Sequence, residues 1–201
     1  MRKENDMGQY YMVLTIDKNG KQTVYDRSVN KQYTMAKLLE HSWWFNPFVN
    51  TICGKIFNKP KQIAWVGDYS NSEGIEFKYY DEVWGDDAKT VGVTEAQVCL
   101  WGKYLVNHTK QVYIDCDEYY EKSLEDNGHY CIHPLPILTC VGNGLGNGDY
   151  SGSNMDMVGT WCLDNISVEC KDKRDLMCLT PKNLKEYRQL NVKDVYFKES
   201  R

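Results

Sequence analysis

The chain has 201 residues, a formal net charge of −4, 42% hydrophobic residues and 26% charged residues. This length suits one domain, and the composition is that of an ordinary globular protein, which excludes fibrous and wholly disordered classes. No apolar run is long enough to span a membrane and the N-terminus is charged, so we expect a cytoplasmic protein without a signal peptide. We interpret the eight cysteines as reduced thiols of a cytosolic protein, because neither a secretory signal nor a CxxC pair accompanies them.

The chain begins with a predicted β-hairpin. Residues 10–16 and 22–25 are rich in β-branched and aromatic side chains, and Asn19-Gly20 between them is a strong hairpin signal. Two helices are predicted next, at 35–41 and 47–57. Asn46 and Pro47 mark the start of the second helix as its N-cap and first helical residue.

The rest of the chain contains predicted strands with few helical signals. The segment 117–126 is charged and is predicted to form a single helical turn. The predicted strands lie at 62–66, 75–80, 110–115, 130–132, 137–141, 161–168 and 195–197. We therefore predict one α+β domain over residues 1–201, with a curved antiparallel sheet and two helices packed on one face. The basic segment 171–201 is a candidate C-terminal flap.

A long glycine-rich loop is predicted between two apolar runs, at residues 142–159, where six of the fifteen glycines lie. Loops of this length in compact domains are often functional. The spacing does not match a phosphate-binding loop, and Val158 stands where a calcium-binding EF-hand loop needs glutamate. A hairpin or Ω-type loop is the plainer interpretation. The candidate binding residues in this loop are Asn143, Asn147, Asp149, Tyr150, Asn154 and Asp156.

Two other clusters are candidates for a site. His129, Cys131 and His133 alternate, so in a strand they would share a face and offer nitrogen and sulfur ligands for zinc, or a cysteine nucleophile with a histidine base. The alternative is that Cys131 is a small buried residue. Trp43 and Trp44 would stack a nucleotide-like ring if exposed, but such a pair more often fills a core.

Charge is distributed unevenly along the sequence. Residues 123–170 contain six acidic side chains and neither lysine nor arginine, whereas the segments 1–61 and 171–201 are basic. Buried sheet with acidic loops would explain this distribution. An acidic face for a basic partner is the functional alternative.

Several short stretches resemble a group of small, uncharacterised proteins from Gram-positive bacteria and their phages. These stretches are Met7-Gly-Gln-Tyr-Tyr11, Glu40-His-Ser42, Asn46-Pro-Phe-Val-Asn50, Trp65-Val-Gly-Asp-Tyr69 and Asn147-Gly-Asp149. The likeness runs over most of the chain and implies an origin in a mobile element. It implies no catalytic residues.

The sequence therefore favours a non-catalytic protein of phage or mobile-element type that binds and inhibits a host protein, such as a nucleic-acid-binding or defence protein. Its acidic surface and glycine-rich loop would make the contact, and neither a cofactor nor direct contact with nucleic acid or membrane is expected. One alternative is an enzyme centred on Cys131, His129 and His133, with or without zinc. Another is a small-ligand binder or sponge that uses Trp43, Trp44 and Trp161.

Overall fold

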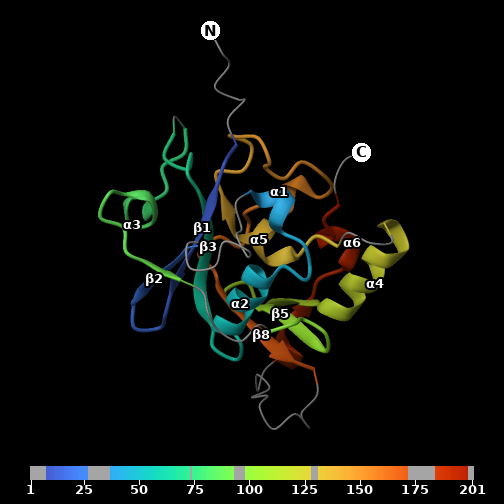
Figure 1. Ribbon diagram of the computed structural model, residues 1–201. Coiled ribbons are helices and arrows are strands. Elements are labelled where there is room, and N and C mark those ends of the chain that lie inside the picture. Colours follow the sequence, from blue (N-terminus) through green and yellow to red (C-terminus); the bar gives the residue numbers. More distant parts are fainter. Residues whose placement is uncertain are drawn as a thin grey trace.

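The computed structural model describes residues 8–26, 37–72, 74–92, 98–127, 131–171 and 184–198. They form a mixed α+β fold around a nine-stranded, mostly antiparallel sheet that stays open (Figure 1). The α+β class predicted from the sequence is thus confirmed. The strand order is β4 (Thr90–Gly92), β2 (Gln22–Asp26), β1 (Tyr11–Ile16), β3 (Lys61–Gly67), β8 (Asn165–Cys170), β5 (Lys103–Asn107), β6 (Val112–Asp115) and β9 (Arg188–Gln189), and β7 (Cys140–Val141) pairs with β3.

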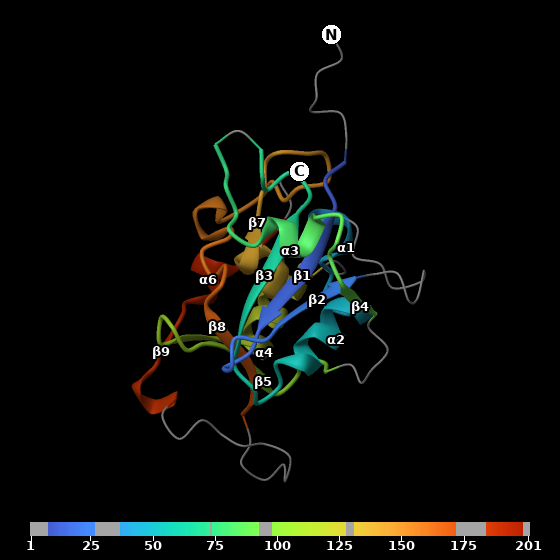
Figure 2. The same cartoon turned by 90° about the vertical axis from the view of Figure 1, so that its left-hand side faces the viewer.

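The sheet is built on the N-terminal hairpin. Asp17 accepts hydrogen bonds from the amides of Asn19 and Lys21, and Gly20 has a φ of 80°, so the predicted turn forms between β1 and β2. β1 pairs antiparallel with both β2 and β3, and Figure 2 shows these three strands side by side. Three pairs are parallel: β2–β4 and β6–β9 at the two margins, and β3–β7 within the sheet.

Six helices accompany the sheet within the described residues. They are α1 (Leu38–His41), α2 (Pro47–Lys55), α3 (Tyr80–Trp84), α4 (Cys116–Asn127), α5 (Pro134–Thr139) and α6 (Val192–Val195). The start of α2 is as predicted: Pro47 is the first helical residue, and the Asn46 side chain accepts from the amides of Phe48 and Val49. The predicted start of the preceding helix, at residues 35–36, lies outside the described residues.

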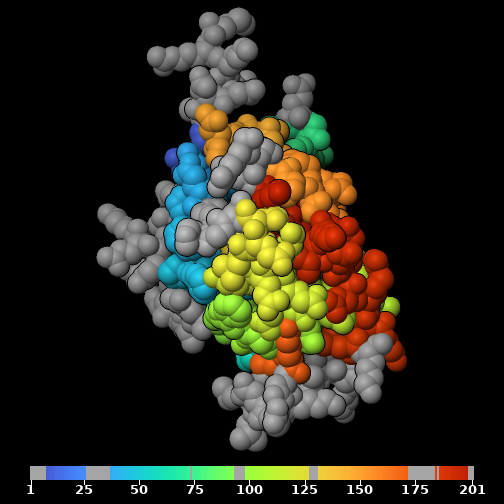
Figure 3. Space-filling view, turned by 90° about the vertical axis from the view of Figure 1, so that its right-hand side faces the viewer, coloured from blue at the N-terminus to red at the C-terminus, as the bar shows by residue number. Residues whose placement is uncertain are grey.

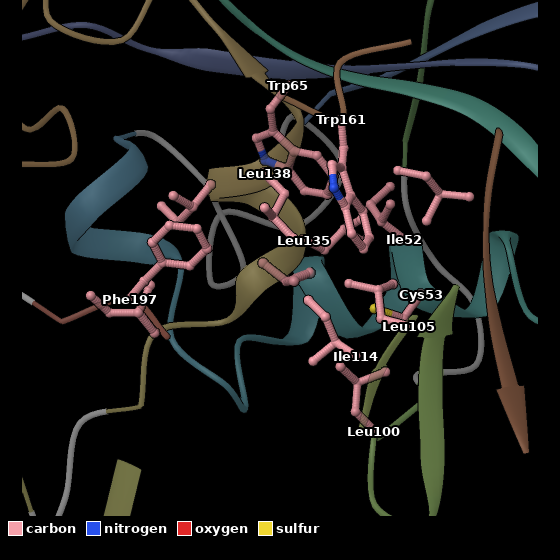
Figure 4. Close-up of a cluster of buried hydrophobic side chains, with 14 of the residues drawn as sticks. Ile52, Cys53, Trp65, Leu100, Leu105, Ile114, Leu135, Leu138, Trp161 and Phe197 are labelled. Atoms are coloured by element: carbon pink, nitrogen blue, oxygen red, sulfur yellow. The ribbon is translucent and has the colours of Figure 1, made fainter. Parts of the chain in front are cut away.

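Apolar side chains cover both faces of β1 and β3. Val13 and Trp65 belong to the main core, and Leu14 and Val66 belong to a smaller core on the other face beside α3 (Figure 1). Because both faces are buried, these strands have nearly continuous apolar sequences. Figure 4 shows part of the main core, in which Trp65, Trp161, Leu135 and Leu138 pack with residues of α2, β5 and β6.

The segment around the two prolines differs from its prediction. Residues 137–141 were expected in a strand, but Pro134 to Thr139 form α5. Proline fits the first helical turn, where backbone amides have no partner within the helix. The ring Nδ1 of His133 accepts from the amide of Leu135 and so caps the helix start. Thr139 adds a hydrogen bond from its hydroxyl to the carbonyl of Leu135.

Other local predictions are also corrected. The charged segment after β6 forms the 12-residue α4 and not a single turn, because Cys116, Tyr119 and Ser123 give it a buried stripe. Residues 75–79 are irregular and lead into α3. In place of the predicted last strand at 195–197, Val195 ends α6 and the next two residues form no strand.

Two further expectations concern the cysteines and the C-terminal part. Cys170 is disulfide-bonded, which corrects the expectation that every cysteine is a reduced thiol. Among the described residues, the free cysteines are Cys53, Cys99, Cys116, Cys131, Cys140 and Cys162. In the described part of the basic C-terminal segment, 184–198, β9 extends the sheet and Phe197 is buried in the main core.

Candidate functional site

The glycine-rich loop is organised by the buried carboxylate of Asp149. Its Oδ2 accepts hydrogen bonds of 2.7–3.0 Å from the amides of Gly144, Leu145 and Gly146. Its Oδ1 accepts a 2.6 Å hydrogen bond from the hydroxyl of Tyr11 on β1. Burial, followed by the charge of Asp149, holds the pKa of Tyr11 well above its usual value. The acceptor atoms of Asp149 are thus engaged within the protein.

The other predicted loop residues have mixed roles. The Asn143 side chain bonds both backbone groups of Tyr150, which is itself buried. Asn154 donates from its side chain to the carbonyls of Lys193 and Tyr196. Asn147 and Asp156 are exposed to solvent. The assignment of this loop to ligand binding stays a prediction.

The predicted histidine and cysteine cluster is only partly described. His129 lies outside the described residues, and Cys131 and His133 are both buried. The ring Nδ1 of His133 accepts from Leu135, so Nε2 carries the hydrogen and lies 3.5 Å from the Sγ of Cys53. Burial lowers the pKa of His133 to about 3 and raises that of Cys131 to about 12. A reactive cysteine needs the opposite shift in its own pKa. In the ranges that the structure describes, no three His, Cys, Asp or Glu residues are grouped to hold a metal.

The lysine- and arginine-free segment does not form one acidic face. Asp149, Asp164 and Glu169 are buried. Asp164 accepts from Asn107 and Lys110. Glu125 and Asp126 are exposed on α4. The exposed negative charge of this segment is therefore concentrated on that helix.

The two adjacent tryptophans differ in their exposure to solvent. Trp44 is buried and its ring stacks on Tyr119 at 5.7 Å, whereas Trp43 is partly exposed. Trp161 is also buried in the main core. The three tryptophans proposed for ring stacking therefore do not share an accessible surface.

An aromatic patch lies on the molecular surface beside α4. Phe45 is 51% exposed, Leu124 49% and Trp101 44%. The rings of Phe45 and Trp101 approach that of Tyr120, with centroids 6.0 and 4.5 Å away. Tyr120 and Leu124 are one helical turn apart on α4 and, with Trp43 and Phe45, line a small cleft. We call Trp43, Phe45, Trp101, Tyr120 and Leu124 the aromatic patch.

Acidic side chains continue this surface along α4. The helix carries five acidic residues and one lysine, and its last turn contains no basic residue. Glu118, Glu121 and Glu125 line a groove of about 480 Å³, whose other wall is residues 189–193. Figure 3 shows this face, with α4 (yellow) between the segment that begins near residue 42 (cyan) and the C-terminal residues (red).

A polar chain that the sequence did not suggest lies on the same half of the sheet. His108 Nε2 is 2.7 Å from the Oγ of Ser167, and that hydroxyl donates a 2.6 Å hydrogen bond to Glu169. His108 Nδ1 is 3.2 Å from the hydroxyl of Tyr187. Ser167 and Glu169 alternate on β8, which hinted at a shared face, but no local signal links them to positions 108 and 187.

No protein-family model, curated protein sequence or solved structure matches this chain. In the described part of the chain, the helices are too short or too polar to cross a lipid bilayer.

Proposed function

We propose that this chain is a non-catalytic, cytoplasmic binding protein of phage or mobile-element type that occupies a surface of a host protein. The convergence of three exposed apolar side chains, Phe45, Trp101 and Leu124, around Tyr120 carries this proposal. The aromatic patch and the acidic face of α4 are its proposed contact surface.

The composition of the patch supports a protein partner. Exposed apolar residues that are scattered singly need no explanation, but a contiguous group marks an interaction site. Three of the six large hydrophobic residues exposed in the described ranges lie in this patch. Tryptophan, tyrosine and phenylalanine are enriched where proteins bind one another, and a few such anchors supply most of the binding energy.

The charge on α4 supports a basic partner. Glu125 and Asp126 lie at the C-terminal end of the helix, where the helix dipole disfavours negative charge. Lys122 contacts both side chains, at 3.4 and 2.9 Å, which offsets part of this cost. Together with Glu118 and Glu121, these carboxylates give the helix an acidic outer face. Such a surface would steer a positively charged partner toward the aromatic patch.

The glycine-rich loop is proposed as a second contact. The Tyr150 hydroxyl lies within hydrogen-bond distance of the carbonyls of Ser153 and Lys198, at 2.8 and 3.0 Å, and the Lys198 ammonium lies 3.6 Å from Asp126 at the end of α4. The loop therefore borders the acidic face at Tyr150, and we propose that its exposed Asn147 and Asp156 add to the contact.

Affinity capture from the bacterial host tests the proposal with matched variants. Phe45→Ser/Trp101→Ser removes the patch anchors, and Val91→Ser removes a similarly exposed apolar side chain outside both proposed contacts. We expect the unchanged protein and the second variant to retain one stoichiometric host protein, and the first variant to lose it.

Capture is repeated at low and high salt, because contact with the acidic face should weaken as salt rises. Equal retention by both variants would reject the aromatic patch as the contact surface. The absence of any stoichiometric partner at either salt concentration would count against the binding function as a whole.

A further inference from the structure

The hydrogen bonds of the polar chain run in one direction, with each residue donating to the next. The order is Tyr187, His108, Ser167 and Glu169. Glu169 is 3% exposed, and its Oε1 accepts the hydroxyl hydrogen of Ser167. The Ser167 oxygen is then free to accept from His108 Nε2, so Nε2 carries the ring hydrogen of the neutral imidazole. The lone pair on Nδ1 faces the hydroxyl of Tyr187 at 3.2 Å. Each hydroxyl or ring hydrogen therefore points along the chain toward the buried carboxylate.

This direction makes His108 a base for the Tyr187 phenol. Burial lowers the pKa of His108, so the ring is neutral and ready to accept a proton near pH 7. If Nδ1 takes the phenolic proton, the resulting imidazolium lies 4.0 Å from the Glu169 carboxylate. A nucleophile next to a base that a third group orients is the arrangement found in covalent catalysis. The other oxygen of Glu169, Oε2, is buried and has no hydrogen-bond partner among the described residues.

Solvent exposure decides which residue of this polar chain can act as the nucleophile. The Ser167 side chain is completely buried, and its hydroxyl hydrogen is committed to Glu169. Tyr187 is partly exposed and stands at the solvent end of the chain. An attacking group must reach its substrate, so Tyr187 and not Ser167 is able to meet a molecule from solution.

We propose that Tyr187 is a nucleophilic tyrosine that accepts an acyl group from small activated acyl donors, with His108 as its general base. The phenolic oxygen attacks the acyl carbon and forms a new C–O bond, while its proton passes to Nδ1 of His108. The bond from the acyl carbon to the leaving group breaks, and the leaving group departs with the electron pair and takes the proton from His108. Ser167 and Glu169 are positioning residues that orient the imidazole. This inference is independent of the proposed binding function.

N-acetylimidazole, applied to the full chain at pH 7, tests the proposal, with peptide mass spectrometry to measure acetylation at each tyrosine. Tyr10 is the internal reference, because it is 41% exposed and lies on a different part of the surface. We expect Tyr187 to be acetylated at least about tenfold faster than Tyr10, since a positioned base contributes factors of this size or more. Equal or slower acetylation of Tyr187 would overturn the proposal.

Two variants separate the base from its positioning residues. His108→Gln should lower the Tyr187 rate to about the Tyr10 rate while Tyr10 itself is unchanged. Glu169→Gln keeps an oxygen that accepts from Ser167 but removes the charge, so it should slow Tyr187 only if the carboxylate supports proton transfer. An unchanged Tyr187 rate in His108→Gln would reject His108 as the base, and an unchanged rate in Glu169→Gln would reject the role of the carboxylate.

The pH dependence of the two acetylation rates in the unchanged protein provides a test that does not require the variants to fold. The titratable groups in contact with His108 are Glu169 on β8 and Tyr187, and the nearby Lys110 is paired with Asp164. The Tyr187 rate should level off once His108 is neutral. The Tyr10 rate should instead keep rising with pH over the same range. Parallel profiles for the two tyrosines would contradict the proposal.

Discussion

The hydroxyl of Tyr11 and the Oδ1 of Asp149 lie 2.6 Å apart and join β1 to the glycine-rich loop across 138 positions of sequence. The same carboxylate gathers three consecutive loop amides through Oδ2. One buried side chain thus fixes both the shape of the loop and its place against the sheet. Because four hydrogen bonds end at this carboxylate, removing it should lower the stability of the folded protein.

Asp149→Ala should therefore destabilise the protein strongly. It leaves three amides and the Tyr11 hydroxyl without their acceptor, and we expect a loss of about 3 kcal/mol or more in the free energy of unfolding. Urea denaturation measures this loss. Asp156→Ala, in the same loop but exposed, should leave the midpoint nearly unchanged. Similar midpoints for the two variants would contradict this role of Asp149.

Two glycines with positive φ should differ in their tolerance of alanine. At Gly159 (φ 71°) an added Cβ would lie 2.6 Å from the carbonyl oxygen of Cys140, whereas at Gly20 (φ 80°) nothing lies within 4 Å. Gly20→Ala should cost about 1 kcal/mol from backbone strain alone. Gly159→Ala should cost roughly 2 kcal/mol more, because the backbone contact must also be relieved. Equal shifts in thermal or urea midpoint would show that the close contact relaxes freely.

His133 should make the protein sensitive to acid. Its pKa is about 3 in the folded chain and about 6.5 when unfolded, so between these values the unfolded state binds the extra proton. The stability is fully present above pH 6.5 and falls as pH decreases toward 3, by up to about 1.4 kcal/mol per pH unit. His133→Asn keeps a side-chain acceptor for the Leu135 amide but does not titrate. The stability of this variant should fall less steeply as the pH decreases from 6.5 to 3. Parallel curves for the two proteins would show that His133 is not the source.

Cys131 should react slowly with thiol reagents in the folded protein. It is buried, and its pKa is raised to about 12, so little thiolate is present at pH 8. Cys99 is only partly buried and should be labelled first by iodoacetamide, as peptide mass spectrometry would show. Rapid labelling of Cys131 would instead revive an enzyme that uses this cysteine.

The sequence predicted elements whose signals are local. Asn19-Gly20 marked the hairpin, and Asn46-Pro47 marked the start of α2, because turn and cap chemistry depends on adjacent residues. It failed at α5, since a short apolar run does not distinguish a buried helix from a buried strand. Prolines in that run fit a helix start as well as an edge strand.

The candidate sites could not be predicted from the sequence, because their residues meet only in the folded chain. Phe45, Trp101 and Tyr120 come from three separate segments, and none has a neighbour in sequence that predicts the others. His108 and Tyr187 meet across 79 positions, with most of the intervening chain devoted to other elements. Composition revealed the excess of acidic residues in the middle of the chain. It did not reveal that Asp149, Asp164 and Glu169 are buried, which leaves Asp156 and the two carboxylates on α4 as the exposed charge of that segment.

The two outer strands of the sheet are short, with three residues in β4 and two in β9. A partner strand that added to either margin would find few backbone groups with which to continue the ladder, and short margins of this kind discourage sheet-to-sheet association. Recognition by this protein is therefore expected to depend on side chains and not on strand addition. Amide hydrogen exchange in β4 should stay the same when a partner is bound, even as exchange around α4 slows.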